Sequence, residues 1–259
     1  MTLPRALVRD VSPRLAEAEL TFLDDRSIDP VRAVAQHAGY VDLLHTLGHQ
    51  VVRVDAAPEH PDGTFVEDTV VVVEDLAVCT RPGAESRRGE VASVRESLFS
   101  LGLRAHDVLA PGTLDGGDVL QVGRHVFVGL GGRTNPDGVD QLRAVLAPLG
   151  RTVVPVHVTG CLHLKSGATA LPDGTVVAVT SWLDTSVFAT VGLEVLEAPE
   201  HAGADLLLSG DRVVVSAAAP RTAELVRLRG FKAYPVAIDE LEKAECGVTC
   251  LSVLVPPTT

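Results

Sequence analysis

Short runs of β-branched residues alternate with polar turns and amphipathic segments along most of this chain. In the first such unit, the runs Thr69–Val73 and Leu76–Thr80 are separated by the polar pair Glu74-Asp75, which predicts a hairpin. A helix is expected over Glu85–Leu101 and a further strand near Leu103–Val108. The pattern therefore predicts a unit with the order strand, turn, strand, helix, strand.

The same unit recurs four more times. The second is expected at Asp118–Val122, His125–Gly129, a helix over Asp137–Leu149 and a strand over Thr152–Val158. The third turns at Pro172-Asp173-Gly174, a strong turn sequence, before a helix near Leu183–Val191 and a strand at Leu193–Leu196. The fourth comprises Asp205–Leu208, Arg212–Ser216, a helix over Arg221–Arg229 and a strand over Lys232–Val236. The fifth is expected to be split, with Thr249–Val255 pairing with Arg5–Val8, and with the helix Pro30–Leu47 and the strand Val51–Asp55 completing it.

One chemically active residue lies near the start of the first strand of each unit. These residues occur at intervals of 48, 48, 42 and 45, and they are Glu67, Asp115, His163, Asp205 and Cys250. A period of about 40–50 residues is typical of repeat architectures. If five units surround one axis, these side chains meet there. The sequence therefore predicts one domain over residues 1–259, an α/β fold of five repeated units closed by its N- and C-terminal strands.

The stretch between Asp10 and Asp29 has no counterpart in the other units. We interpret this polar, charged segment as an insertion that forms a mobile flap over the axis.

Composition limits the classes of function. A net charge of −12 and a pI near 5.1 argue against a nucleic-acid-binding protein, because such proteins need a basic surface. Four cysteines in 259 residues are too few for a disulfide framework. The first residues lack an apolar signal segment, and no apolar run is long enough to span a membrane. We therefore expect a cytoplasmic protein without a membrane or nucleic-acid partner.

Cys250, His163 and Asp115 are a candidate catalytic set. A thiol becomes a nucleophile when a base or a cation favours its thiolate, and a carboxylate can orient a histidine for that role. Taken alone, each residue is more often structural: a lone cysteine is usually a small packing residue. Metal binding by Cys250, Cys246 and His163 is a competing interpretation, although this set lacks the usual spacing and a fourth ligand.

Two pairs of charged residues are candidates for substrate binding. Glu67 and Asp68 are adjacent and either cap a turn or hold a cationic group. Arg87 and Arg133 follow the hairpins of adjacent units, where each alone is more often a solvated surface arginine. As a pair they could bind a carboxylate through two-pronged hydrogen bonds. Gly116 and Gly117 indicate backbone room at the axis rather than a phosphate-binding loop.

Six segments share their order and spacing with a known family. They are Phe65-Val66-Glu67-Asp68, Arg81-Pro82-Gly83-Ala84-Glu85-Ser86-Arg87-Arg88-Gly89-Glu90, Leu114-Asp115-Gly116-Gly117-Asp118, Arg133-Thr134-Asn135, Leu162-His163-Leu164-Lys165 and Thr249-Cys250-Leu251-Ser252. Together they resemble the dimethylargininase (dimethylarginine dimethylaminohydrolase) family of the guanidino-modifying pentein superfamily. The resemblance extends from about Arg5 to Val255 and implies a five-bladed α/β propeller of ββαβ units.

The resemblance also implies roles for individual residues. It identifies Cys250 as the nucleophile, His163 as the general acid and base, and Asp115 as the carboxylate that orients the histidine. The resemblance also implies which residues contact the substrate. Glu67 and Asp68 would contact its guanidinium, and Arg87 and Arg133 its carboxylate. Its α-amino end would contact Asp62, Leu20 and the carbonyl of Ala244.

Two places depart from the family pattern. The flank Glu245-Cys246-Gly247 differs, and Gly203-Ala204-Asp205 stands where the family commonly has Ala-Ala-Asn-Cys. Asp205 therefore inherits no role from the resemblance.

The expected activity is hydrolysis of Nω-methylated arginines to citrulline and dimethylamine or methylamine, through a covalent thiouronium intermediate on Cys250. The resemblance implies no cofactor and no metal, and a small-molecule substrate as the partner; a homodimer stays open. The alternatives are a compact arginine deiminase, a citrulline-directed enzyme, and a non-enzymatic propeller that serves as a binding module.

Overall fold

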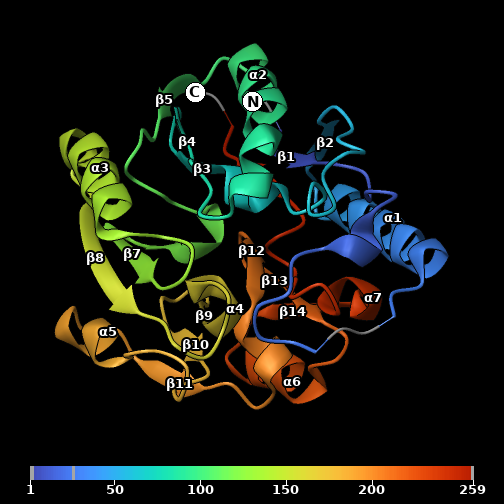
Figure 1. Cartoon of the computed structure of the whole chain (residues 1–259). Helices are drawn as coiled ribbons and strands as arrows, with labels where there is room; N and C mark the ends of the chain where they lie inside the picture. Colours follow the sequence, from blue (N-terminus) through green and yellow to red (C-terminus); the bar gives the residue numbers. More distant parts are fainter. Residues whose placement is uncertain (1–2, 25–26, 258–259) are drawn as a thin grey trace.

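Five three-stranded sheets surround a common axis in the computed structural model, which describes residues 3–24 and 27–257 (Figure 1). In every sheet the innermost strand is antiparallel to the middle strand, and the outermost strand is parallel to the middle one. Helices α1, α2, α3, α5 and α6 lie toward the rim (Figure 1). The predicted fold class, a five-bladed α/β propeller, is confirmed.

The blades follow the units expected from the sequence, with small differences in their bounds. The first contains β3 (Val70–Val73), β4 (Leu76–Cys79), α2 (Val91–Ser100) and β5 (Arg104–Asp107). The second contains β6 (Val119–Val122), β7 (His125–Leu130), α3 (Pro136–Leu146) and β8 (Thr152–His157). The third contains β9 (Ala168–Ala170), β10 (Val176–Ala178), α5 (Ser186–Thr190) and β11 (Val195–Glu197). The fourth contains β12 (Leu206–Ser209), β13 (Arg212–Ser216), α6 (Pro220–Leu228) and β14 (Lys232–Val236).

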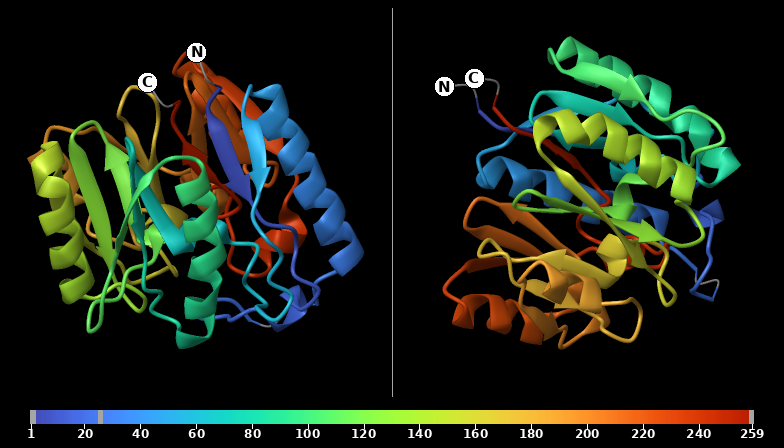
Figure 2. Two further views of the ribbon diagram at one scale, coloured as in Figure 1. Left: turned by 90° about the horizontal axis from the view of Figure 1, so that it is seen from above. Right: turned by 90° about the vertical axis from the view of Figure 1, so that its left-hand side faces the viewer.

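The fifth blade joins the two ends of the chain, as predicted. It contains β15 (Val253–Val255), β1 (Arg5–Val8), α1 (Pro30–Thr46) and β2 (Gln50–Arg53). Arg5 pairs with Val255 and Leu7 with Val253 in the antiparallel part of this sheet. Figure 2 shows the two ends side by side. Closing the ring in this way leaves no blade without two neighbours.

Three of the hairpins have two-residue turns. In each of them, the first of the two turn residues has a positive φ. The angles are 57° at Glu74, 57° at Gly123 and 65° at Gly210. Turns of this hand match the right-handed twist of paired strands, which explains the glycine at two of the three places.

The apolar cores lie between adjacent blades. One cluster joins Val71 and Val78 of the first blade to Val126, Leu142 and Leu146 of the second. Each unit therefore buries its apolar face against a neighbour, which is why a repeat of this kind needs the closed ring.

A short helical turn precedes the innermost strand of four blades. These turns are η2 (Val66–Thr69), η4 (Gly116–Asp118), α4 (Leu164–Gly167) and η6 (His201–Ala204). In a regular strand Glu67 and Asp68 would face opposite sides. Within the turn η2 both are buried at the axis instead.

The insertion at residues 10–29 contains one short helical turn, η1 (Leu15–Glu17), and its residues 25 and 26 lie outside the described part of the chain. Among the described residues, none of the helices combines the length and the apolar character needed to cross a bilayer. All four cysteines are unpaired.

Candidate active site

The helical turns around the axis bring the predicted catalytic residues together at one end of the ring. Asp115 precedes η4, His163 precedes α4, and Cys250 lies in the turn before β15. All three are buried, with exposed fractions of 0%, 3% and 5%. A small cavity is lined by Cys250 and His163, together with Asp62, Asp68, Arg87, Arg133 and Ala244 among the other predicted residues.

Three predicted residues do not line this cavity. Asp115 lies behind the imidazole of His163, and Glu67 lines a separate cavity among the innermost strands. Leu20 is half-buried, and its neighbour Glu19 lines the active-site cavity instead.

The imidazole of His163 lies between two carboxylates. Its Nε2 is 3.0 Å from Oδ2 of Asp115, and its Nδ1 is 3.6 Å from Oδ1 of Asp68. Burial alone would lower the pKa of His163, but Asp68, Asp115 and Asp118 together raise it to about 10. The histidine is therefore an imidazolium in the free protein and has a proton to donate.

Asp115 is held in the orientation that this contact needs. Its Oδ1 accepts a hydrogen bond of 2.8 Å from the backbone N–H of Gly83, which leaves Oδ2 for His163. Glycine is required beside the pair, because a Cβ atom on Gly117 would lie 2.6 Å from Oδ1 of Asp68 and 2.7 Å from Nδ1 of His163. A Cβ atom on Gly116 would lie 2.0 Å from the carbonyl oxygen of Glu67. The backbone room expected at these glycines is thus confirmed.

A third carboxylate, that of Asp118, supports the histidine and was missed from the sequence. Asp118 accepts hydrogen bonds from the backbone N–H of Leu164 at 3.0 Å and from Oγ1 of Thr134 at 2.6 Å. Oγ1 of Thr134 in turn accepts a hydrogen bond from the backbone N–H of Asp115. Asp118 therefore connects the backbones next to both His163 and Asp115. Its place at the end of the Leu-Asp-Gly-Gly-Asp motif was the available signal.

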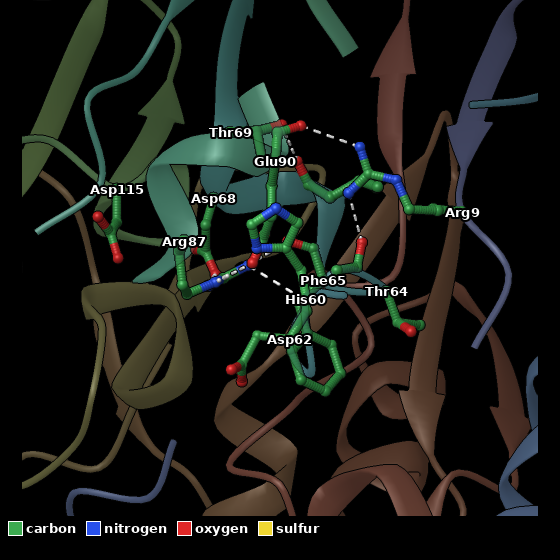
Figure 3. Close-up of polar contacts among 12 residues, drawn as sticks. Arg9, His60, Asp62, Thr64, Phe65, Asp68, Thr69, Arg87, Glu90 and Asp115 are labelled. Carbon is green, nitrogen blue, oxygen red and sulfur yellow. Dashed lines mark hydrogen bonds and ion pairs between the residues drawn. The ribbon is translucent and has the colours of Figure 1, made fainter. Parts of the chain in front are cut away.

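Asp68 is joined to a buried cluster of charges (Figure 3). Its Oδ2 is 2.5 Å from Nη1 of Arg87, and Arg87 also donates to both carboxylate oxygens of Glu90 at 3.1 and 2.8 Å. Burial raises the pKa of Asp68, but His163 and Arg87 outweigh it and lower the pKa to about 2. The carboxylate stays ionised and available to a cation.

Each of the three guanidinium nitrogens of Arg87 donates a hydrogen bond to another part of the protein. Besides the two carboxylates, its Nη2 donates to the carbonyl oxygens of Phe65 and Asp62 at 3.0 and 3.3 Å. Arg9, the residue after β1, supports the same cluster from behind by donating to the carbonyl oxygen of Glu90 at 2.9 Å (Figure 3). The guanidinium of Arg9 is fully buried, and sequence reasoning did not identify it.

Arg133 has an open donor. Its Nη2 is 3.4 Å from Oε2 of Glu19, whereas its buried Nη1 has no hydrogen-bond partner among residues 3–24 and 27–257. A buried guanidinium donor without a partner is costly, so this atom is suited to bind an anionic group in the cavity.

The insertion crosses the site and is tied to the loop that precedes Cys250. Oε1 of Glu245 accepts hydrogen bonds from three successive backbone N–H groups, those of Thr21, Phe22 and Leu23, at 2.9, 2.5 and 2.7 Å. On the other side, the backbone N–H of Glu19 donates to Oδ2 of Asp62 at 3.3 Å. The described part of the insertion is therefore fastened over the cavity at two places. Burial raises the pKa of Asp62 to about 6.

Cys250 lines the active-site cavity together with His163. Its Sγ accepts a 3.5 Å hydrogen bond from the backbone N–H of Gly247. Burial raises the pKa of Cys161 to about 12 and that of Cys79 to about 11, and it also raises the pKa of Cys246. Burial therefore opposes thiolate formation at these three cysteines.

Glu67 contributes to a network on the inner side of Cys250. Its Oε1 is 2.5 Å from Nζ of Lys165, and its Oε2 accepts a 2.7 Å hydrogen bond from Oγ1 of Thr249. Its backbone N–H donates to the carbonyl oxygen of Cys250 at 3.3 Å. Lys165 and Thr249 were not identified from the sequence, although both adjoin predicted catalytic residues.

The side chains at the axis that could bind a metal ion are instead explained by their contacts with His163. In the described part of the chain, Asp68, Asp115 and His163 place ligand atoms within 4.8 Å of one another, and the set of Cys250, Cys246 and His163 forms no such group. Each ring nitrogen of His163 already faces a carboxylate oxygen. The charge-assisted contacts of an imidazolium account for this cluster.

Comparisons with known proteins agree with this arrangement. No family model matches the chain. It is 49% identical over 251 residues to N(G),N(G)-dimethylarginine dimethylaminohydrolase of Streptomyces coelicolor, covering 96% of each chain. A structure of the Pseudomonas aeruginosa enzyme, a cysteine-to-serine mutant complexed with citrulline, has a TM-score of 0.90 at 30% identity and covers 98% of this chain and 100% of that one.

A further structure is an adduct of a dimethylarginine dimethylaminohydrolase variant with S-methyl-L-thiocitrulline. It has a TM-score of 0.89 at 30% identity and covers 98% of this chain and 100% of that one. Identity of this extent over nearly the whole length shows common descent. The chain belongs to the dimethylargininase (dimethylarginine dimethylaminohydrolase) family.

Proposed function

We propose that this protein hydrolyses Nω-methylated arginines to citrulline and dimethylamine or methylamine, with Cys250 as the nucleophile. The observation that carries the proposal is that Cys250 and a His163 flanked by two carboxylates line one cavity with the ionised carboxylate of Asp68. In this cavity, the carboxylate of Asp68 can accept hydrogen bonds from a guanidinium, and His163 has the proton that a departing amine requires.

The substrate is held at both ends in this proposal. Its guanidinium lies against Asp68, while Glu67 contributes negative charge from the inner side of the axis. Its carboxylate binds the open donor of Arg133, and Arg87 adds positive charge next to it. The α-amino group lies near Asp62 and the carbonyl oxygen of Ala244, which line the cavity. The backbone at Leu20, next to the cavity-lining Glu19, completes its contacts.

The first half of the reaction forms the covalent intermediate. The positive charges of the substrate guanidinium and of the imidazolium favour the thiolate of Cys250. The thiolate attacks the guanidinium carbon and forms a C–S bond. His163 gives its proton to the methylated nitrogen, and the C–N bond breaks to release the alkylamine. An S-alkylthiouronium remains on Cys250.

The second half consumes one water molecule. His163, now neutral, takes a proton from water as the oxygen attacks the same carbon. The C–S bond breaks, so Cys250 leaves as the thiolate; the second proton of the attacking water passes to solvent, and citrulline is formed. Asp115 stabilises the imidazolium each time it forms and keeps the ring in place.

The test is citrulline release from asymmetric dimethylarginine, monomethylarginine and arginine in parallel, with EDTA present. We expect turnover of the methylated substrates, its loss in Cys250→Ser, and its retention in Cys79→Ser, the matched replacement of a cysteine in β4 away from the site. Preference for unmodified arginine would support a compact arginine deiminase instead. Turnover in Cys250→Ser would refute the assignment of the nucleophile, and an inactive protein with an unreactive Cys250 would support the binding-module alternative.

A further inference from the structure

Among the described residues, a buried carboxylate without a cationic partner lies next to the turn that carries Cys250. Asp205 precedes β12 and is 4% exposed. Its Oδ1 accepts a 2.9 Å hydrogen bond from the backbone N–H of Thr249, and its Oδ2 lies 3.2 Å from Oγ1 of Thr249. Within the described residues, no basic nitrogen lies within ion-pair distance of this carboxylate. An ionised carboxylate in such a place is costly to bury.

The hydrogen atoms in this network can be counted. Oγ1 of Thr249 contacts two carboxylate oxygens, Oε2 of Glu67 at 2.7 Å and Oδ2 of Asp205 at 3.2 Å. A hydroxyl carries one hydrogen, so it can donate to only one of them. If both carboxylates were ionised, the other contact would bring two oxygen atoms together without a hydrogen between them.

The ion pair with Lys165 decides which carboxylate is charged. Nζ of Lys165 lies 2.5 Å from Oε1 of Glu67 and favours the ionised form of Glu67. The hydroxyl of Thr249 then donates to Glu67, at the shorter of its two contacts. The contact with Asp205 is completed only when Asp205 donates a hydrogen to Oγ1 of Thr249.

We propose that Asp205 is a positioning residue for Cys250 that acts as a neutral, hydrogen-donating carboxylic acid. In that form its carbonyl oxygen accepts from the Thr249 N–H and its hydroxyl donates to Oγ1 of Thr249. An amide side chain would present the same acceptor and donor. The inference rests on the proposed role of Cys250 as the nucleophile.

Contacts on both sides of Cys250 connect it to Asp205. Thr249 is the residue before Cys250, and Asp205 contacts both its backbone and its side chain. Gly247 donates its N–H to Sγ of Cys250, and a Cβ atom on Gly247 would lie 2.0 Å from Oδ2 of Asp205. The carboxyl group of Asp205 therefore packs directly against the turn that places the sulfur atom.

The surroundings of Asp205 favour the neutral form. Burial, followed by the charge of Glu67, raises the pKa of Asp205 to about 7, against the hydrogen bonds of Thr249 and the charge of Lys165. The other titratable groups that face it are those of neighbouring elements and of the adjoining cavity; they are Tyr40, Cys246, Cys250, His201, Asp239, Glu242, Lys243 and Glu245. Most of these are acidic or neutral, so loss of the proton would add a second negative charge at the axis.

Asp205 also lines a second, larger cavity, together with Trp182, His201 and Gly247, and with Phe22 and Leu23 of the insertion. Its carboxyl group therefore borders a space beside the active-site cavity, through which a proton can reach it.

Ionisation of Asp205 is expected to impair Cys250 in two ways. It breaks the hydrogen bond to Thr249, and it places a negative charge beside the thiolate that the reaction needs. The protein should therefore lose activity as the pH rises through about 7, and an amide at this position should remove that loss.

The test compares pH profiles of Asp205→Asn, Asp205→Ala and the unaltered protein between pH 6 and 9. Two rates are measured: citrulline release, and alkylation of Cys250 by iodoacetamide followed by peptide mass spectrometry. Each profile is normalised to its own value at pH 6. Asp211→Asn is the matched control, because Asp211 lies in the same blade with a side chain that is 63% exposed.

By pH 8, we expect the rate of citrulline release by the unaltered protein to be about tenfold lower than that of Asp205→Asn, as for the loss of one required proton. We also expect the rate of Cys250 alkylation to rise at a higher pH in the unaltered protein than in Asp205→Asn. Asp205→Ala, which offers neither hydrogen bond, should be slower than Asp205→Asn throughout, and Asp211→Asn should follow the unaltered protein. Superimposed profiles for the unaltered protein and Asp205→Asn would overturn the proposal, as would an Asp205→Asn variant slower than Asp205→Ala. If no variant releases citrulline, the proposed function fails, while the alkylation profiles still decide the role of Asp205.

Discussion

Replacing Asp115 by asparagine should remove the proton donor of the reaction while leaving the cavity intact. Oδ1 of Asp115 accepts the N–H of Gly83 at 2.8 Å, and Oδ2 accepts from Nε2 of His163 at 3.0 Å. In Asp115→Asn, the amide oxygen can keep the contact with Gly83, so the NH₂ group faces Nε2. That nitrogen must then be an acceptor, which makes His163 neutral with its hydrogen on Nδ1.

The size of the effect follows from this change of tautomer. A buried hydrogen bond to a charged group contributes about 1.5–3 kcal/mol, and in Asp115→Asn the imidazolium loses this bond and would point its Nε2–H at the NH₂ group, so only the neutral tautomer keeps the contact. A neutral imidazole cannot release its remaining hydrogen at ordinary pH, so general acid catalysis is lost. Such catalysis contributes about 10²- to 10⁴-fold, and we expect kcat to fall by that factor. KM should change little, because Asp115 does not line the cavity.

The assay is steady-state citrulline release from dimethylarginine at pH 7, with circular dichroism to confirm that the variant is folded. Asp140→Asn is the matched control, since its side chain is 70% exposed on α3. A folded Asp115→Asn variant whose kcat stays within threefold of the unaltered protein would refute the reasoning about His163.

Three other predictions concern stability, backbone room and the insertion. Since the pKa of His163 is raised from 6.5 to about 10, its contacts stabilise the fold fully below about pH 6.5, and this contribution is lost as the pH rises through about 10. His163→Asn should therefore have a flatter dependence of Tm on pH over this range, and an unchanged slope would contradict the assignment. Gly117→Ala should lower kcat at least about 10²-fold, because its Cβ would displace Asp68 and His163. Gly123→Ala, which has open space but a φ of 57°, should instead cost only about 1 kcal/mol of stability and leave turnover unchanged. Glu245→Ala removes the shared acceptor of three backbone N–H groups in the insertion. It should raise KM about 5- to 50-fold and speed the proteolysis of that segment. Equal KM values would show that the insertion is held by other contacts.

Much of the fold could be predicted because its units are local. Each hairpin is encoded by two short apolar runs and a turn, and each helix by its apolar face, so the order of elements is visible along the chain. The closure of the ring was also predictable, since β15 and β1 each lacked a hairpin partner next to them along the chain. The positions of Asp115, His163 and Cys250 then followed from their equivalent places in the units.

Other features of the site depend on contacts between distant segments. The one-turn helix η2 buries Glu67 and Asp68 together, where a regular strand would have separated them. Arg87 was expected to bind the substrate carboxylate or to be a solvated surface residue, yet the fold buries it and joins it to Asp68 and Glu90. These arrangements depend on which carbonyl oxygens and carboxylates reach one arginine, and spacing along the chain does not contain that information.

The number of units, their internal order and the residues at the axis could all be predicted from the amino-acid sequence, because they depend on short-range periodicity and on a repeat of about 45 residues. The charge state and orientation of those residues depend on the folded ring. His163 is an imidazolium because two carboxylates from different blades flank it, and Asp205 is paired with Thr249 because the ring brings the fourth and fifth blades together. Protonation depends on distance, burial and neighbouring charge, and these quantities exist only once the ring has closed.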